Sequence, residues 1–314
     1  MRVAITGGTG FAGRYIARLH QEAGDTVHIL SRKKRDDFGT TRFFAADLTD
    51  SHAPLADFLD GAEVLYHCAA ELHDECLMEA LHVRGTRNLL HAAKGCVGRW
   101  VQLSSVGVYG LRQVGTVNEE SDCHPSGLYE VTKYDAERAV ALFCRENAMP
   151  FSILRPSVVI GADMPNPVIR TWIHYLQKRL FFFVGSYGTI ANYISVENLA
   201  RALHLCGIHP NAIGETFIVS ESIQIEQVAD IFRGTLSLAP VRLRLPEFPL
   251  RVAASIAQCI PDFPLSHARI DALTRRMTYE SNKIRERLGY VPVKSLAQSL
   301  REIAVAAQRS KTWL

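Results

Sequence analysis

The 314-residue sequence has little net charge and no long apolar run. Its formal net charge of +3 is too small to favour a nucleic acid or an anionic membrane surface as a partner. No apolar stretch approaches the roughly 20 residues of a membrane span, and a strand pattern starts directly after Met1, which predicts no signal peptide. The seven cysteines show neither disulfide nor metal-site spacing, which favours reduced thiols. These absences predict a cytoplasmic protein that binds no metal.

The chain is large enough for a full core and alternates between two kinds of pattern. With 47% hydrophobic and 21% charged residues, it can bury a doubly wound core and a smaller lobe. Helical spacing follows the first apolar run and returns over 74–93 and 128–146. This alternation predicts an α/β Rossmann fold, in which a parallel sheet carries helices on both faces. Short strand-like runs occur at 3–6, 26–30, 42–45, 63–67, 99–103 and 151–154.

The second half of the sequence is organised differently. Beyond Pro156 proline and glycine become frequent, and helical patterns lie at 168–178, 196–205, 225–236 and 249–260. We therefore expect a Rossmann domain over 1–160 and a smaller, mostly helical substrate lobe over 161–314. The lobe would close over the carboxyl ends of the strands. The helical segment 196–205 could pack on the main sheet, and the strand-like segment 215–219 could pair within it. We therefore expect residues 190–220 to return to the first domain.

A glycine-rich turn follows the first predicted strand and opens the first predicted helix. Gly7 permits a tight turn, Gly10 lets the backbone approach a pyrophosphate, and Gly13 lets helix and strand pack closely. The N-terminus of the helix, at Phe11 and Ala12, then offers free N–H groups and a partial positive charge to phosphates. This context predicts a dinucleotide cofactor on these five residues.

The end of the second predicted strand indicates which dinucleotide is bound. An NAD enzyme usually has an acidic residue there, whereas this chain has Ser31 and Arg32 at the start of a basic run that reaches residue 35. An acidic side chain would repel a ribose 2′-phosphate, and Ser31 and Arg32 can bind one. The alternative is a solvated basic loop, with Asp36 or Asp37 turning back to the ribose. The charge argument favours NADP over NAD.

Tyr129 and Lys133 lie four residues apart in the helical pattern 128–146, so they share one face. A free tyrosine has a pKa of about 10, too high for a base at neutral pH. Lys133 and a cationic nicotinamide ring both favour the phenolate, and a pKa of about 7 would need ~4 kcal/mol of differential stabilisation. Ser105 follows the fifth strand at the same sheet edge and can donate a hydrogen bond to a substrate oxygen. Together they predict proton transfer at a secondary alcohol or ketone, with Lys133 also bonding the nicotinamide ribose.

Several further residues are weaker site candidates. Asp47 and Leu48 follow the third strand and are placed to bind the adenine edge, although an acidic turn explains Asp47 almost as well. His67 and His73 lie near the end of the fourth strand and could reach a substrate, but structural roles suit both. Trp172 could line an apolar substrate pocket, and core packing of the lobe explains it equally well. The basic cluster over 269–287 favours a solvated helical face over a phosphate site.

These motifs resemble the extended short-chain dehydrogenase/reductase superfamily, also called the NAD-dependent epimerase/dehydratase family, over essentially the whole chain. The resemblance implies a tightly held nicotinamide cofactor and a catalytic triad of Ser105, Tyr129 and Lys133. It also implies cofactor contacts at 68–70, namely Cys68, Ala69 and Ala70, and at Pro156. The segments that carry it are 6–13, 47–48, 66–70, 83–90, 104–110, 129–133 and 154–156.

Departures from the family pattern reduce the number of activities that the resemblance allows. Sugar-nucleotide dehydratases carry an acidic pair where this chain has Val106 and Gly107, which disfavours dehydration and puts Val106 against the substrate. Epimerases usually bind the diphosphate with an arginine whose place is taken by Ala191, and a frequent asparagine is replaced by His82. The segment 196–200 resembles the V-[DE]-N-x-A pattern of the 3β-hydroxysteroid dehydrogenase and dihydroflavonol reductase branch.

The combined prediction is an NAD(P)-dependent oxidoreductase that acts on a hydrophobic or polycyclic secondary alcohol or ketone, with Tyr129 as acid and base. A nucleotide-sugar epimerase or keto-sugar reductase, binding its phosphates with other residues, is the first alternative. A nicotinamide-binding sensor without catalysis is the second, although it need not keep Ser105, Tyr129 and Lys133 together. The expected partner is a small-molecule substrate, and a homodimer built from helices is compatible with the sequence.

Overall fold

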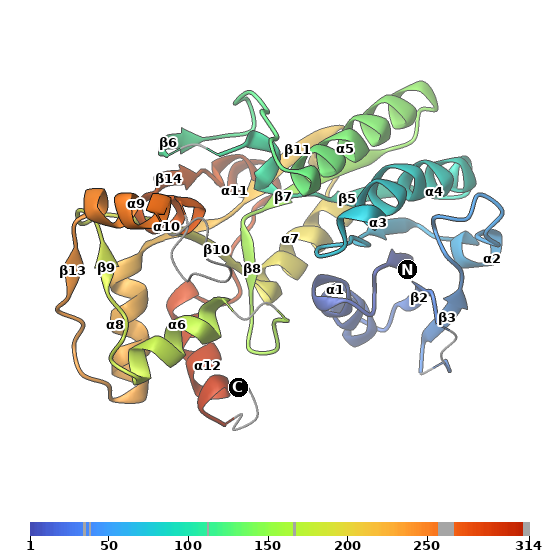
Figure 1. Cartoon of the computed structure of the whole chain (residues 1–314). Helices are drawn as coiled ribbons and strands as arrows, with labels where there is room; N and C mark the ends of the chain where they lie inside the picture. The colour runs from blue at the N-terminus through green and yellow to red at the C-terminus, as the bar shows by residue number, and fades with distance from the viewer. Residues whose placement is uncertain (34–35, 38, 112, 166–167, 257–266, 310–314) are drawn as a thin grey trace.

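The computed structural model describes residues 1–33, 36–37, 39–111, 113–165, 168–256 and 267–309 (Figure 1). The predictions for residues 34–35 and 257–260 therefore lie outside the described residues. Seven parallel strands form the central sheet in the order β11-β7-β5-β4-β1-β2-β3, which confirms the predicted Rossmann-type α/β fold. These strands are β1 (Arg2–Thr6), β2 (Thr26–Ser31), β3 (Thr41–Ala45), β4 (Val64–His67), β5 (Arg99–Leu103), β7 (Phe151–Pro156) and β11 (Glu215–Val219).

Helices cover both faces of the central sheet, which explains its continuous apolar runs. In β1, Val3 and Ile5 pack into one hydrophobic cluster and Ala4 packs into the other, because successive side chains of a strand point to opposite faces. The first cluster includes side chains of α1 (Phe11–Glu22), α7 (Val196–Ile208) and α11 (Asn282–Leu288). The second includes side chains of α2 (Ala56–Leu59), α4 (Thr86–Ala93) and α5 (Leu128–Glu146).

The predicted helix over 74–93 is not one continuous α-helix. It consists of α3 (Glu75–Glu79), the π-helical turn η1 (Ala80–Gly85) and α4. Within η1, the carbonyl of His82 accepts a hydrogen bond from the hydroxyl of Thr86, 2.5 Å away. The extra residue per turn lets the His82 side chain reach α5, as described below, and π-helical turns are frequent at functional sites.

The C-terminal part forms a smaller, mostly helical lobe, at the left of Figure 1. Side chains of α6 (Val168–Gln177), α8 (Ile225–Leu236) and α12 (Leu296–Arg309) build a separate hydrophobic core. The chain passes between the two parts more than once, because α7 and β11 pack in the Rossmann part whereas β10 and β12 pair with each other. Along the stretch of chain that the structure describes, none of the helices has the length and apolarity that a bilayer crossing requires.

The lobe contains one three-stranded sheet, two strand pairs and five helices within its described residues. The sheet joins β8 (Val158–Ile160), β10 (Ile190–Ser195) and β12 (Glu221–Gln224), and the pairs are β9 (Phe183–Val184) with β13 (Arg244–Leu245) and β6 (Val114–Val117) with β14 (Arg276–Tyr279). The helices are α6 (Val168–Gln177), α8 (Ile225–Leu236), α9 (Glu247–Ile256), α10 (His267–Thr274) and α12 (Leu296–Arg309). Short 3₁₀ turns are η2 (Val106–Tyr109) and η3 (Pro210–Ala212).

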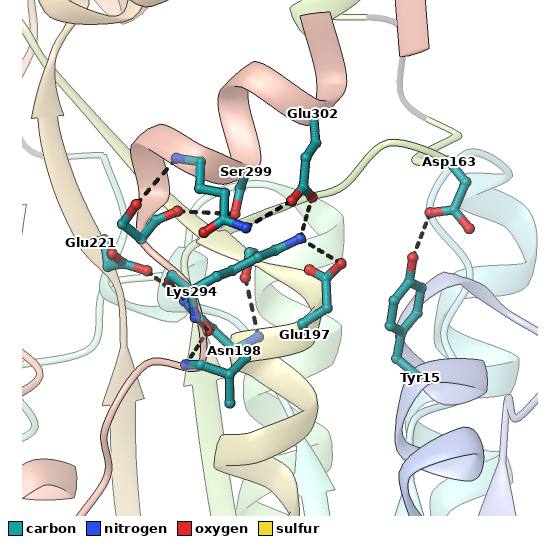
Figure 2. Close-up of polar contacts among 12 residues, drawn as sticks. Tyr15, Asp163, Glu197, Asn198, Glu221, Lys294, Ser299 and Glu302 are labelled. Carbon is teal, nitrogen blue, oxygen red and sulfur yellow. Dashed lines mark hydrogen bonds and ion pairs between the residues drawn. The ribbon is translucent and has the colours of Figure 1, made fainter. Parts of the chain in front are cut away.

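The V-[DE]-N-x-A segment ties α7 to the end of the chain (Figure 2). The side-chain amide of Asn198 donates to a carboxylate oxygen of Glu221 and to the carbonyl of Lys294, both at 2.9 Å. The ammonium of Lys294 lies 2.7 Å from Glu197 and 2.5 Å from Glu302 of α12. These contacts join four segments that are distant in sequence, so this motif holds the lobe on the Rossmann part.

A second contact joins α1 to the loop that follows β8. The hydroxyl of Tyr15 donates to Asp163 at 3.0 Å, as Figure 2 shows, and Arg14 lies 2.5 Å from the same carboxylate. Burial and this hydrogen bond raise the pKa of Tyr15 to about 12. The helix that begins at the glycine-rich turn is therefore fixed against the lobe.

Candidate active site

A cavity of about 1860 Å³ runs along the carboxyl ends of the central strands and under the lobe. His67 and His73, which were considered as substrate contacts, do not line it. His73 lies in the loop between β4 and α3. Its side chain is exposed, because the carboxylate of Glu71 accepts hydrogen bonds from three successive backbone N–H groups and folds this loop toward solvent. The predicted site residues that do line the cavity are Gly7, Gly10, Phe11, Ala12, Gly13, Ser31, Arg32, Asp47, Leu48, Cys68, Ala69, Ala70, Ser105, Val106, Tyr129, Lys133, Pro156 and Trp172.

The glycine-rich turn presents backbone groups to the cavity. Gly7 has a φ of +66°, and a Cβ there would lie 2.7 Å from the backbone nitrogen of Ala69. A Cβ on Gly13 would clash with the carbonyl of Gly7, so α1 packs this closely on the turn only with glycine at 13. Gly10 is the N-cap of α1 and supplies no side-chain cap. The first N–H groups of α1 are thus available to an anion such as a pyrophosphate.

The end of β2 places a cation at the cavity wall. Ser31 and Arg32 both line the cavity, whereas the acidic residues at 36 and 37 do not. The carboxylate of Asp37 accepts a hydrogen bond from the N–H of Phe43 at 2.8 Å, and it lies 3.5 Å from Arg42. Asp37 is therefore directed along β3 in this structure, away from the cavity wall.

Asp47 forms the acidic turn that was considered for it, and it also lines the cavity. One carboxylate oxygen accepts hydrogen bonds from the N–H and the hydroxyl of Thr49, at 2.9 and 2.8 Å, and these bonds lower its pKa. The residue also lines the cavity beside Leu48, whose carbonyl accepts a hydrogen bond from Asn88. Asp47 therefore forms an acidic turn with Thr49 at the edge of the cavity.

Two hydroxyl groups that the sequence did not indicate line the cavity without partners. Ser104 follows β5 and Ser157 follows β7, and the two strands are neighbours in the sheet. Both Oγ atoms are buried and have no hydrogen-bond partner within the described ranges. A buried polar group left unpaired costs about 1–3 kcal/mol. The pair therefore indicates a polar ligand group at the ends of these strands.

The three predicted catalytic residues, Ser105, Tyr129 and Lys133, all line the cavity. The ammonium of Lys133 donates to the carbonyl of Leu103 at 2.6 Å, and burial lowers the pKa of Lys133 to about 8. The Oγ of Ser105 accepts a hydrogen bond from the N–H of Gly107 at 3.0 Å. Because that bond uses an oxygen lone pair, the hydroxyl hydrogen of Ser105 is available to a substrate oxygen. Tyr129 precedes Lys133 by one helical turn and lines the same cavity.

The pKa of Tyr129 moves in the direction opposite to the expected one. Burial raises it to about 12, and the carboxylate of the neighbouring Glu130 adds to the increase. The expectation that Lys133 acidifies this phenol is wrong for the protein alone. Taking a phenolate out of water disfavours the charged form, and the neighbouring carboxylate disfavours it further. The phenol therefore keeps its proton at neutral pH.

His82 supports the catalytic helix from outside the cavity. Its Nε2 accepts a hydrogen bond from the backbone N–H of Glu71 at 2.9 Å, so the ring proton is on Nδ1, which donates to the hydroxyl of Thr132 at 2.8 Å. That hydroxyl donates in turn to the carbonyl of Leu128. The ring also packs edge-to-face on Tyr129, with centroids 5.6 Å apart. Burial lowers the pKa of His82 to about 4, so this neutral tautomer is kept.

His67 has the structural role that the sequence favoured. Its ring nitrogens lie 2.6 Å from the hydroxyl of Thr6 and 2.9 Å from that of Thr86. Since Thr86 donates its single proton to a carbonyl, Nε2 of His67 donates to Thr86 and Nδ1 accepts from Thr6. This chain of bonds fixes the end of β4 beside the glycine-rich turn.

The lobe gives the cavity a mostly apolar wall, which includes the ring of Trp172 at 5.4 Å from that of Phe181. Four charged residues that the sequence did not assign to the site also line the cavity, namely Lys33, Glu71, Glu130 and Arg275. Glu130 follows Tyr129, and Arg275 lies between α10 and β14. The interpretation of the basic cluster as a solvated helical face is wrong for Arg275, because this residue is outside a helix and faces the cavity. The apolar lining includes Val158, Val168, Ile169, Tyr175, Leu180, Phe182, Ile190 and Tyr193.

Comparison with known sequences gives one family and several relatives. The model of the NAD dependent epimerase/dehydratase family matches residues 3–220. The chain is 28% identical to sterol demethylase protein B of Methylococcus capsulatus, over 95% of this chain and 95% of that protein. It is 24% identical to 3beta-hydroxysteroid-dehydrogenase/decarboxylase isoform 2 of Arabidopsis thaliana, over 95% of this chain, and it spans 60% of that plant protein.

Solved structures share the architecture. UDP-glucuronic acid 4-epimerase from Bacillus cereus, in complex with NAD, superposes with a TM-score of 0.76 at 18% identity and covers 98% of this chain and 97% of its own. At that identity the likeness shows the fold. Together with the family model, it confirms the resemblance found in the sequence and the prediction of an enzyme of this type.

Proposed function

Because the chain belongs to the NAD-dependent epimerase/dehydratase family, we propose that it is an NADP-dependent oxidoreductase that interconverts a hydrophobic secondary alcohol and its ketone. One observation carries the proposal: Ser105, Tyr129 and Lys133 line the same cavity as the glycine-rich turn, and the lobe closes that cavity with apolar side chains. A catalytic triad beside a dinucleotide turn supports redox chemistry, and an apolar wall supports a hydrophobic substrate.

The cavity fits a nicotinamide dinucleotide along its length. The glycine-rich turn brings the N-terminus of α1 to the cavity, where it would bind a pyrophosphate, and Arg32 on the same cavity would bind a 2′-phosphate. The unpartnered hydroxyls of Ser104 and Ser157 would bond a carboxamide at the opposite end. When bound, the nicotinamide supplies the hydride in reduction and takes it up in oxidation.

In ketone reduction, the side chains of the triad act on the substrate oxygen. Tyr129 is protonated at neutral pH and donates this proton to the oxygen as the carbon becomes an alcohol carbon. Ser105 donates a hydrogen bond to the same oxygen and stabilises the negative charge that develops there. Lys133, anchored by the carbonyl of Leu103, would hold a ribose hydroxyl with its remaining N–H groups. Oxidation of the alcohol runs these proton steps in reverse.

The cavity wall offers less support for the alternatives. A nucleotide-sugar epimerase would bind a diphosphate through the lobe, and Ala191 lines the cavity where the family places an arginine for this purpose. A sensor without catalysis would have no need for the hydroxyls of Tyr129 and Ser105 in the cavity that holds the cofactor turn. Both features favour hydride exchange with a released alcohol or ketone.

Turnover of purified protein tests the proposal. NADPH or NADH is incubated with polycyclic ketones, or with uridine and thymidine diphosphate sugars, and the absorbance of the reduced nicotinamide is followed. We expect ketone-dependent loss of NADPH absorbance. Conversion of a nucleotide sugar with no net change in the nicotinamide would instead show an epimerase.

A further inference from the structure

Glu130 holds a carboxylate that its neighbours in the cavity do not use. Three carboxylates line the cavity among the described residues, those of Asp47, Glu71 and Glu130. That of Asp47 accepts hydrogen bonds from Thr49, and that of Glu71 accepts three from backbone N–H groups of its own loop. No hydrogen bond or ion pair joins the carboxylate of Glu130 to another described residue. It is therefore available to a molecule bound in the cavity.

Two glycines make room for the side chain of Glu130 beside Ser105. A Cβ on Gly127, the N-cap of α5, would clash with the carboxylate. A Cβ on Gly107 would lie 2.8 Å from Cγ of Glu130 and 3.7 Å from its Oε1. The same point lies 3.3 Å from Oγ of Ser105. The carboxylate and the Ser105 hydroxyl are thus neighbours, and both residues line the cavity.

Other titratable groups near the triad are poor bases at neutral pH. Burial and the charge of Glu130 raise the pKa of Tyr129 to about 12, so the phenol keeps its proton. Burial also raises the pKa of the Cys68 thiol to about 12. The ammonium of Lys133 donates to the carbonyl of Leu103. A glutamate carboxylate, in contrast, is ordinarily ionised at neutral pH and can act as a general base.

These positions suit proton transfer at a substrate carbon. In the proposed reaction, a ketone oxygen accepts hydrogen bonds from Ser105 and Tyr129. The carbon next to the carbonyl carbon is two bonds from that oxygen, so a carboxylate beside Ser105 can reach its hydrogens. Such a hydrogen is acidic, because the oxygen takes up the negative charge when the C–H bond breaks. Hydrogen-bond donors at the oxygen stabilise that charge.

We propose that Glu130 is a further catalytic base, which takes a proton from the carbon next to the carbonyl carbon and so enolises the bound ketone. The C–H bond breaks, its proton goes to Glu130, and its electron pair forms the carbon–carbon double bond of an enolate. Ser105 and Tyr129 bond the enolate oxygen. The reverse step returns a proton from Glu130 to the carbon, so no oxidant or reductant is consumed. This activity rests on the proposed function, because it places the ketone at Ser105 and Tyr129.

Uptake of deuterium from heavy water tests the inference. Protein saturated with oxidised NADP, which cannot reduce a ketone, is incubated in heavy water with the polycyclic ketones of the turnover assay, androstanone among them. Mass spectrometry follows deuterium at the carbons next to the carbonyl. We expect uptake faster than in buffer alone, and a rate about 10²- to 10⁴-fold lower in Glu130→Gln. Glu120→Gln, exposed and outside the cavity, is the matched control and should exchange at the unmodified rate.

Ketone reduction with NADPH is measured in the same variants. It should fall far less than deuterium uptake in Glu130→Gln, because hydride transfer to the carbonyl carbon removes no proton from its neighbour. Uptake at the buffer rate in the unmodified protein would overturn the inference. Equal losses of uptake and reduction in Glu130→Gln would also overturn it, since they would show that Glu130 only supports the site. Reduction without uptake would remove this inference alone, and uptake without reduction would remove the proposed oxidoreductase alone.

Discussion

Replacing Arg32 with alanine should change the choice of cofactor more than the overall strength of binding. Arg32 lines the cavity after β2, while the nearby Asp37 is held by the N–H of Phe43. A charge-assisted hydrogen bond contributes about 1.5–3 kcal/mol, and because Arg32 is exposed the lower end applies. About 1.5 kcal/mol corresponds to a roughly tenfold weaker NADPH complex. NADH has no 2′-phosphate, so its affinity should not change.

Fluorescence titration of each reduced nicotinamide measures these affinities directly. Arg42→Ala is the matched control, because Arg42 pairs with Asp37 and does not line the cavity. The difference between the two cofactors should also shrink as salt is raised, since the contact is exposed. Equal losses of NADPH and NADH affinity in Arg32→Ala would refute the argument that this side chain recognises the 2′-phosphate.

Two further substitutions probe the site and its support. Glu130→Gln removes a charge that raises the pKa of Tyr129, so the pKa of Tyr129 should fall. The loss of ketone reduction at alkaline pH should then begin at a lower pH than in the unmodified protein. Glu120→Gln, outside the cavity, is the control and should leave the pH–rate profile unchanged. An unmoved profile in Glu130→Gln would contradict this electrostatic coupling. Glu137→Gln leaves the buried guanidinium of Arg155 without its carboxylate, 2.5 Å away, and should lower the free energy of unfolding by about 3–5 kcal/mol in urea titrations. A decrease in the free energy of unfolding below about 1 kcal/mol, typical of an exposed ion pair, would contradict the claim that the Glu137–Arg155 pair acts as a buried one.

Local sequence patterns were sufficient to predict the central sheet and the glycine-rich turn. Residues 3–6 form a continuous apolar run because both faces of β1 are covered, and such a run can be recognised in the sequence. Glycine is required at 7 and 13, because a Cβ at either position would clash with neighbouring backbone. Such features depend on neighbours in the chain or on the general rule for parallel sheets, so they could be predicted.

Features that depend on tertiary contacts could not be read from the sequence. The π-helical turn at 80–85 accompanies bonds between His82 and Thr132, which are 50 residues apart. The raised pKa of Tyr129 follows from burial, whose extent the motif does not encode. Arg275 and Arg276 are alike in sequence, yet one faces the cavity and the other faces solvent. Each of these outcomes is decided by packing between distant segments.

Tyr129→Phe tests the central claim most directly, because it removes one hydroxyl and keeps the ring that packs on His82. Ketone reduction with NADPH and the dissociation constant of NADPH are measured side by side, with Tyr134→Phe on the same helix but outside the cavity as the control. The account predicts a loss of turnover of about 10²- to 10⁴-fold with cofactor affinity retained. Undiminished turnover in Tyr129→Phe would contradict it.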